Sequence, residues 1–204
     1  MQITTGLRAI LSAPTVYDFT QSVMGAGRIR REIADSFLGC NQPIRVLDIG
    51  CGTAAIRDYL SSDAIYFGFD ISRPYIEHAQ RKYRGRGEFF CELLDIKRIQ
   101  TLPKFDVVLA IGVLHHLDDR EARHVMQLAN QCLEFGGRLV SIDPCFADKQ
   151  NPVARFLISR DRGQNVRTQE GYRSIPEGIF STVQGELRHR AWIPYTHWLM
   201  ECVK

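Results

Sequence analysis

A glycine turn preceded by a carboxylate is the feature of this sequence that most clearly indicates ligand chemistry. In Val46–Thr53 (VLDIGCGT) an apolar run leads directly into Gly50-Cys51-Gly52, and Asp48 lies two residues before the first glycine. Glycine lets the backbone turn tightly and lets a ligand approach without a Cβ in the way. The Asp48 carboxylate would repel a pyrophosphate but attract a ligand with an ammonium or sulfonium group. The spacing therefore favours a cationic ligand over a dinucleotide, although a strand-end acid bonding its own loop amides is the plain alternative.

Two further carboxylates follow, each after a later apolar run. Asp70 ends the second run, and an acid about 20 residues beyond a glycine turn can accept hydrogen bonds from both hydroxyls of a ribose. Asp95 follows the third run and could accept from an adenine amino group, with Ile71 and Ile96 as apolar faces for the ring. A surface-loop position is the alternative for Asp95 alone. We expect these two acids and Asp48 to converge at one rim and to grip a positively charged nucleoside.

His115 and His116 follow the fourth apolar run and are candidates for a general base. The ordinary pKa of an imidazole, about 6.5, suits proton transfer near neutral pH. Adjacent residues on a helical turn point about 100° apart, so one of the two is expected to face a ligand. Packing or hydrogen bonding is the alternative role. A metal site with Asp118, Asp119 and His124 is not favoured, because nothing fixes these side chains on one face.

Candidate contacts to a second substrate lie outside this central stretch. Tyr17 and Gln21 are spaced (i, i+4) on an expected N-terminal helix and could close over a ligand, or simply pack. Tyr195 and His197 lie one residue apart on an expected strand, so they should share a face. Guanidinium groups suit a carboxylate or phosphate, with surface solvation as the alternative. The candidates of this kind, with a nearby tyrosine, are Arg155, Arg160, Arg162, Arg167, Tyr172 and Arg173.

The elements that position these residues are strands alternating with helices. Near-continuous apolar runs predict strands covered on both faces, as in a parallel sheet, at residues 45–49, 65–70, 88–91, 106–111 and 138–142. Helices are expected at residues 53–60, 74–83 and 119–134. Ser72 is the candidate N-cap of the second helix, and Phe135-Gly136-Gly137 is expected to end the third. This alternation predicts right-handed crossovers and an open α/β sheet.

The two flanks of the chain depart from this alternation. Residues 16–38 predict one or two helices that could cover the sheet edge or the site. Residues 144–178 form a long connection with a helix near 153–158, and connections of this length in a compact domain are usually functional. Two final strands are expected near 180–189 and 195–203, joined through Pro194 and paired antiparallel.

The composition indicates one globular domain. The chain has 204 residues, of which 45% are hydrophobic and 24% charged, and its net charge of +3 is too small to favour nucleic acid or a membrane as partner. No stretch approaches the ~18 apolar residues of a membrane span, and no signal peptide is expected. The six cysteines lack C-x-x-C spacing, as in a protein with reduced thiols. We expect a cytoplasmic protein that is a monomer or homodimer and binds no metal.

Taken in order, five motifs resemble those of class I methyltransferases that depend on S-adenosylmethionine (SAM). The motifs are VLDIGCGTA (46–54), FGFDIS (67–72), LLDI (93–96), FDVVLAIGVLHHLDD (105–119) and LEFGGRLVSIDP (133–144). The resemblance covers roughly residues 40–145 and extends to uncharacterised bacterial members. It implies an α/β fold: a doubly wound, Rossmann-like sheet of seven strands, mostly parallel with an antiparallel last strand.

The resemblance also implies SAM as cofactor and a role for each matched residue. Asp48 and the turn Gly50-Cys51-Gly52 would hold the methionine part, and the backbone at Ile111–Gly112 would lie near its amine. Asp70 would hold the ribose, and Asp95 with Ile96 the adenine. The chain would then divide into an N-terminal helical cap (1–39), a SAM-binding core (40–145), and an acceptor-pocket region with the final strand pair (146–204).

The function predicted from these observations is methyl transfer from SAM to an O or N atom of a small-molecule acceptor. Two alternatives stay open: a SAM-binding protein without catalysis, and an NAD(P)-dependent oxidoreductase. The second needs G-x-G-x-x-G, whose sixth position is Ala55 here, and it is opposed by Asp48 and by the absence of a Tyr-x-x-x-Lys pair. No basic stripe interleaved with aromatics favours nucleic acid, and the motif after the fourth strand lacks the Asn/Asp-Pro-Pro-Tyr type sequence of base methylators.

Overall fold

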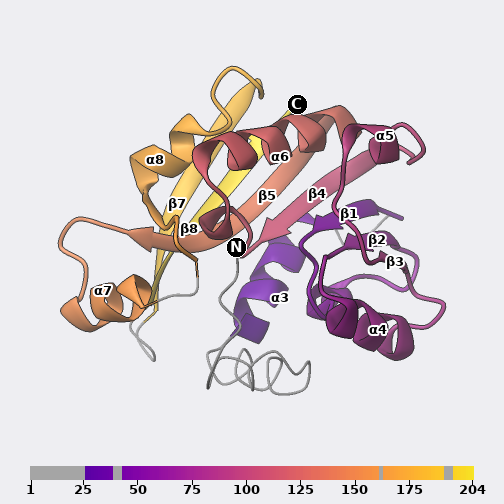
Figure 1. Ribbon diagram of the computed structural model, residues 1–204, viewed down its shortest axis with the longest axis horizontal. Coiled ribbons are helices and arrows are strands. Elements are labelled where there is room, and N and C mark those ends of the chain that lie inside the picture. The colour runs from indigo at the N-terminus through magenta and orange to yellow at the C-terminus, as the bar shows by residue number, and fades with distance from the viewer. Residues whose placement is uncertain (1–25, 39–42, 161–162, 191–194) are drawn as a thin grey trace.

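A mixed β-sheet runs through the protein, and its central strands are the apolar runs of the sequence (Figure 1). The computed structural model describes residues 26–38, 43–160, 163–190 and 195–204. The strand order along the sheet is β3-β2-β1-β4-β5-β8-β7. The bounds are Arg45–Ile49 (β1), Ile65–Phe69 (β2), Glu88–Phe90 (β3), Phe105–Ile111 (β4), Leu133–Phe146 (β5), Thr182–Arg190 (β7) and Tyr195–Val203 (β8). A two-residue strand, β6 (Arg167–Thr168), pairs with β5 off this path.

The first five strands of the sheet are parallel, and β8 is antiparallel to both of its neighbours, β5 and β7. The expected sheet, mostly parallel with a reversed last strand, is therefore confirmed. The reversed strand is not at the edge, because β8 inserts between β5 and β7. The hairpin of β7 and β8 is the antiparallel pair expected at the end of the chain, and Pro194 within it lies outside the described residues.

Helices cover both faces of the sheet (Figure 1). One face carries α3 (Ala26–Phe37), α4 (Arg73–Lys82) and the 3₁₀ helix η1 (Ala55–Tyr59), whose apolar side chains share a core cluster. The other carries α5 (Ile96–Ile99), α6 (Asp119–Cys132) and α8 (Gln169–Ser174). The 3₁₀ helix η2 (Leu114–His116) joins β4 to α6, and α7 (Pro152–Ser159) packs against β8 and β5. None of the described helices is long and apolar enough to span a membrane.

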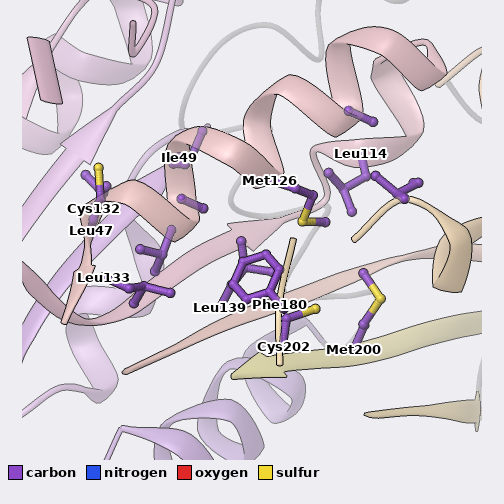
Figure 2. Packing of buried hydrophobic residues seen from close by; sticks show 14 of the residues in the cluster. Leu47, Ile49, Leu114, Met126, Cys132, Leu133, Leu139, Phe180, Met200 and Cys202 are labelled. Atoms are coloured by element: carbon purple, nitrogen blue, oxygen red, sulfur yellow. The ribbon is translucent and has the colours of Figure 1, made fainter. Parts of the chain in front are cut away.

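Alternate residues of each central strand supply the two cores. Along β1, Val46 belongs to the cluster on the α3 face, and Leu47 and Ile49 belong to the cluster on the α6 face. Successive side chains of a strand point to opposite faces, so a strand covered on both faces is apolar at nearly every position. Figure 2 shows the α6 face, where Met126 of that helix lies over side chains of several strands.

Two helix boundaries differ from those expected. The segment after the glycine turn forms only a five-residue 3₁₀ helix, because Ala54 at its N-cap has a left-handed backbone (φ 55°) and Leu60 is already extended. The third expected helix ends at Cys132 rather than at Phe135-Gly136-Gly137, because Leu133 is extended and pairs with Phe105 as the start of β5. Gly136 has the expected positive φ (77°), but inside the strand.

The predicted N-cap and the helices predicted in the two flanks of the chain are confirmed only in part. Ser72 is the N-cap of α4, although its side chain makes no capping hydrogen bond to a described residue. The helix expected near 153–158 is α7, whereas β6 and α8 in the same connection were not predicted. Of the helices expected over 16–38, the structure shows α3; residues 16–25 lie outside the described residues. The division into cap, core and acceptor region stays a prediction.

Arg57 in η1 is fully buried and, in the described chain, donates only to main-chain carbonyls. Its guanidinium reaches Arg86 O (2.6 Å), Ser61 O (2.9 Å), Leu60 O (3.3 Å) and Ser62 O (3.3 Å). Burial, together with the charge of Arg86, lowers the pKa of Arg57 from its ordinary value. The side chain ties the turn after η1 to the turn after α4.

We therefore expect Arg57→Met to lower the free energy of unfolding by about 3 kcal/mol, because the main-chain carbonyls that accept hydrogen bonds from the Arg57 guanidinium would all lose their donor. Urea unfolding measures the difference. The matched control is Arg84→Met, at an exposed position, which should stay within about 0.5 kcal/mol of the parent protein. Equal stability of the two variants would contradict a structural role for Arg57.

Candidate active site at the carboxyl ends of the strands

The glycine turn lies where the order of the strands reverses. From β1 the chain builds β2 and β3 on one side, then returns to β4 on the other side of β1. Ligands of open α/β sheets bind at such a switch point, beyond the carboxyl ends of the strands. The loops after β1 and β4 touch there: a Cβ on Gly50 would lie 2.6 Å from Val113 Cγ2. Gly50 (φ 70°) also has a backbone that other residues rarely adopt, so the sequence places glycine where both geometry and space require it.

The main-chain amides of the turn are already engaged by the end of β2. Gly50 N and Cys51 N both donate to Phe69 O (2.8 and 3.0 Å), and Gly52 N donates to Asp70 Oδ2 (2.9 Å). A pyrophosphate-binding turn instead directs its amides at the ligand and is followed by a full α-helix. Here a carboxylate lies against the turn and only a short 3₁₀ helix follows. The geometry therefore disfavours a dinucleotide.

Asp70 is placed to accept two hydroxyl groups. Its half-buried carboxylate accepts one main-chain bond at each oxygen, from Ser72 N to Oδ1 (2.7 Å) and from Gly52 N to Oδ2 (2.9 Å). Burial raises the pKa of Asp70, and these two bonds oppose the rise. Because a carboxylate oxygen has two acceptor sites, each oxygen can take one more hydrogen bond. This arrangement suits the 2′- and 3′-hydroxyls of a ribose.

Asp48 is buried on the strand face that α3 covers. Only 3% of the residue is exposed, and Tyr66 Oη donates to its Oδ2 at 2.6 Å. Burial raises the pKa of Asp48 to about 7; the bond from Tyr66 and the charge of Arg30 oppose the rise, and the charge of Asp70 adds to it. A carboxylate with so high a pKa gains strongly from a nearby cation. The predicted cationic ligand therefore has a matching group here.

The side chain of Cys51 faces inward. It packs on β2, where a Cβ on Gly68 would lie 2.9 Å from Cys51 Sγ, and burial raises the pKa of its thiol. Cys51 is partly buried, and its contact with a cofactor stays a prediction.

Asp95 and three aliphatic side chains lie beyond β2 and β3. Asp95 is exposed and caps α5, accepting from Arg98 N at 2.7 Å through Oδ1. Ile71, Leu93 and Ile96 are 68%, 76% and 45% exposed. The two expected apolar faces for an adenine are thus present at the surface, and Leu93 is a third that the sequence analysis missed. The convergence of carboxylates holds for Asp48 and Asp70, which interact electrostatically, while contact of Asp95 with a nucleoside stays a prediction.

His115 is held by a carboxylate from the neighbouring strand. Its ring Nδ1 lies 2.7 Å from Asp143 Oδ1, and its backbone N donates to the same oxygen at 3.1 Å. Both residues are buried, and Asp143 Oδ2 makes no hydrogen bond to any described residue. The ring of His116, in the same 3₁₀ turn η2, contacts the His115 ring with centroids 4.0 Å apart, and which of the two faces a ligand stays a prediction.

Known proteins match this architecture. A family model described as "Methyltransferase domain" matches residues 47–139, which include the glycine turn, Asp70 and both histidines. Over these residues the chain is similar to the class I SAM-dependent methyltransferases.

Individual methyltransferases show how far the similarity extends. The 27-O-demethylrifamycin SV methyltransferase of Amycolatopsis mediterranei is 37% identical over 102 residues, covering 47% of this chain and 36% of that protein. An uncharacterised methyltransferase of Anoxybacillus flavithermus is 27% identical over 173 residues, covering 78% of this chain and 77% of the relative. The crystal structure of magnesium protoporphyrin IX methyltransferase from Synechocystis PCC 6803 with bound SAM shares the fold (TM-score 0.59, 18% identity, 95% and 80% coverage). The chain thus spans about a third of the first relative and most of the second.

The segment 163–172 contacts the turn that carries the two histidines. Arg167 donates to Leu114 O (2.8 Å) and Leu117 O (2.8 Å) on either side of the histidines, and it pairs with Asp119 (2.8 Å). Asn165 N donates to His115 O at 3.0 Å. The sequence analysis offered Arg167 as a ligand for an acidic acceptor; the structure corrects this, because its guanidinium is already committed to the protein.

Tyr172 is a second correction. It was expected to contact an acceptor, but it is 0% exposed and its hydroxyl donates to Pro144 O at 2.8 Å. Tyr172 is therefore a core residue, and burial raises its pKa far above the ordinary value. The apolar environment of α8, which the sequence did not predict, explains the difference.

The remaining acceptor candidates are only partly placed. Tyr195 and His197 share a face as expected, with ring centroids 4.9 Å apart. Arg160 is exposed, with its guanidinium 5.0 Å from the centre of the Phe156 ring, and its contact with an acceptor stays a prediction. Tyr17, Gln21 and Arg162 lie outside the described residues. Within the described ranges, no three metal-ligating side chains come together.

Proposed function

We propose that this protein is an enzyme that transfers a methyl group from SAM to a hydroxyl oxygen of a small-molecule acceptor. The observation that carries the proposal is the buried His115–Asp143 pair directly beside the switch point. A Cβ on Gly112 would lie 3.7 Å from His115 Cε1, and the next residue, Val113, contacts the glycine turn. A general base therefore adjoins the turn on which the cofactor would lie.

The residues present fit SAM. Asp48 offers a buried negative charge for a cation, and Asp70 offers two acceptor oxygens for a ribose. Exposed Ile71, Leu93 and Ile96 offer apolar contact to an adenine. When bound, SAM supplies an electrophilic methyl group on a positively charged sulfur. The chain's part is to hold this group and the acceptor in line at contact distance, which accounts for much of the acceleration in such displacements.

The presence of a general base favours a hydroxyl oxygen over an amine nitrogen as the acceptor atom. A hydroxyl oxygen must lose its proton as it forms the bond to carbon, whereas a neutral amine attacks with a lone pair it already has. The hydroxyl proton moves to His115 Nε2, because Nδ1 faces Asp143. The Asp143 carboxylate stabilises the resulting imidazolium and fixes the tautomer, and the proton later leaves to solvent. The name of the first relative, a 27-O-demethylrifamycin SV methyltransferase, supports an oxygen acceptor.

A thermal unfolding scan with SAM, NAD and ATP tests the cofactor. We expect SAM alone to raise the melting temperature, since a ligand at 100 times its Kd adds about 2.7 kcal/mol to the stability of the folded state. Asp70→Asn should remove most of the rise, because an amide offers one acceptor oxygen in place of two. The matched control, Asp148→Asn at an exposed position, should keep it. Stabilisation by NAD alone would overturn the assignment.

Turnover separates an enzyme from a SAM-binding protein without catalysis. Labelled SAM should yield labelled product with phenols or alcohols in an acceptor panel. Binding of SAM without transfer to any hydroxyl or amine of the panel would favour the inactive alternative.

A further inference from the structure

Gly163, in the connection that leads to β6, lies directly against the candidate base His115. The residue is buried. A Cβ on Gly163 would overlap Cδ2 of the His115 ring, and it would lie 2.8 Å from Cγ and 2.6 Å from the main-chain oxygen of the same residue. These separations are shorter than van der Waals contact. A side chain at position 163 therefore fits only if the imidazole or the main chain of the segment moves.

Described residues contact the His115 ring on several sides. Asp143 Oδ1 lies 2.7 Å from Nδ1, and the centroid of the His116 ring is 4.0 Å from that of His115. Gly163 closes the Cδ2 side, and a Cβ on Gly112 would lie 3.7 Å from Cε1. Because Nδ1 and Cδ2 are on opposite sides of an imidazole, Asp143 and Gly163 hold the ring between them.

Hydrogen bonds fix the segment that brings Gly163 to the ring. Asn165 N donates to His115 O at 3.0 Å, two residues beyond the glycine. Arg167 donates to Asn165 O at 2.9 Å and to Leu114 O at 2.8 Å, so it ties the segment to the residue before the base. Hydrogen bonds from a charged donor are stronger than those between neutral groups. We therefore expect the imidazole, rather than the segment, to move when a Cβ is added at position 163.

We propose that Gly163 is a positioning residue for the methyl transfer, whose main chain keeps the His115 ring against Asp143. The inference rests on the proposed function, in which His115 is the general base. A neutral imidazole carries its proton on one nitrogen and accepts at the other, and a carboxylate at Nδ1 selects the tautomer that accepts at Nε2. A base must also lie within hydrogen-bond reach of the proton that it takes. A displaced ring would lose both properties while the cofactor site stays intact.

Gly163→Ala tests this role, and the matched control is Gln164→Ala, at an exposed position of the same segment. We expect Gly163→Ala to lower kcat for hydroxyl acceptors by at least about tenfold, a part of what a positioned base contributes, with the Kd for SAM unchanged. Gln164→Ala should keep both values. In a His115→Gln background, Gly163→Ala should lower kcat by less than about twofold further, because it acts through the base. The full loss in that background would overturn the inference.

The tautomer of His115 is a second readout, and it does not depend on turnover. Imidazole ¹⁵N NMR at a pH where the ring is neutral, assigned by comparison with His115→Gln, should show the proton on Nδ1 in the parent. Gly163→Ala should shift the population toward the Nε2-protonated tautomer, whereas Gln164→Ala should leave it unchanged. Parental kcat and a parental tautomer in Gly163→Ala would overturn the role of Gly163.

The outcomes also separate this inference from the function beneath it. A parent protein that binds SAM but methylates no hydroxyl, with a tautomer that still changes in Gly163→Ala, would refute the proposed function and leave the contact standing. If circular dichroism shows that Gly163→Ala does not fold, Arg167→Lys supplies the test. Lysine keeps the charge but lacks the planar fork that spans Asn165 O and Leu114 O, so the same changes should appear in smaller size. Parental kcat and tautomer in that variant would likewise overturn the inference.

Discussion

His115→Gln should lower kcat by at least about 100-fold while leaving the Kd for SAM nearly unchanged, because a positioned general base contributes about 10²–10⁴-fold. Glutamine has a similar reach and can still hydrogen-bond, but it cannot take a proton at neutral pH. The effect should be specific to hydroxyl acceptors. Single-turnover kinetics at saturating SAM would measure the chemical step directly, and calorimetry would measure binding.

The adjacent histidine supplies the matched control. His116 shares η2 and touches the His115 ring, but it is the His115 Nδ1 that lies 2.7 Å from Asp143 Oδ1. His116→Gln should therefore reduce kcat by less than about tenfold, below the contribution of a positioned base. If His116→Gln causes the larger loss, the base is His116 and the Asp143 pair serves structure alone.

Asp143→Asn probes the same unit through its kinetics. The amide oxygen can still accept from His115, so the ring stays oriented while the negative charge beside it is removed. Because that charge would stabilise the imidazolium formed as the proton is transferred, we expect kcat for hydroxyl acceptors to fall while the Kd for SAM stays unchanged. A purely structural role would lower stability but leave kcat of the folded variant unchanged.

Local sequence patterns were sufficient for the scaffold and for the position of the glycine turn. Strands such as Phe105–Ile111 are apolar at nearly every position because both faces are covered, so their place in a parallel sheet follows from the sequence alone. Gly50 and Asp70 follow from spacing, because the turn and the end of the next strand must meet at one edge. These inferences use only short-range pattern and the rules of sheet topology.

Contacts between distant segments were beyond such reasoning. Asp143 lies 28 residues from His115 in the chain, and its signal was only a polar residue within an otherwise apolar buried strand. Arg167 and Tyr172 were predicted to bind the acceptor because the long connection was assumed to be exposed. The sequence did not predict β6 and α8, to which the two residues belong. In the structure Arg167 donates to Leu114 O, and Tyr172 is buried.

Asp48→Asn should stabilise the ligand-free protein above neutral pH. The pKa of this acid is 3.8 ordinarily and about 7 in the folded chain. Below about pH 4 both states hold the proton; between about pH 4 and 7 only the folded state holds it, so the stability contributed by the neutral form is lost as the pH rises. One pKa unit corresponds to about 1.4 kcal/mol, so the parent loses roughly 4 kcal/mol across this range. Asparagine keeps the hydrogen bond from Tyr66 and has no proton to lose in this pH range. The free energy of unfolding of the variant, measured in urea at pH 8, should therefore be higher than that of the parent by about 2 kcal/mol or more.

The same variant should bind SAM roughly 100-fold more weakly, because a buried ammonium would lose its counter-charge. In the parent, SAM must displace the proton of Asp48, so affinity should fall about tenfold per pH unit below about pH 7. The groups around Asp48 do not supply this dependence: Tyr66 and Cys51 have pKa values raised well above their ordinary ones, and Arg30 stays charged. Asp70 also has a raised pKa. Any pH dependence of SAM binding that remains in the Asp48→Asn variant is therefore the part contributed by Asp70. Calorimetry at pH 6, 7 and 8 should give a much weaker pH dependence of the Kd for the variant than for the parent. A variant that is less stable at pH 8 yet binds SAM with parental affinity would show that Asp48 serves folding rather than the ligand.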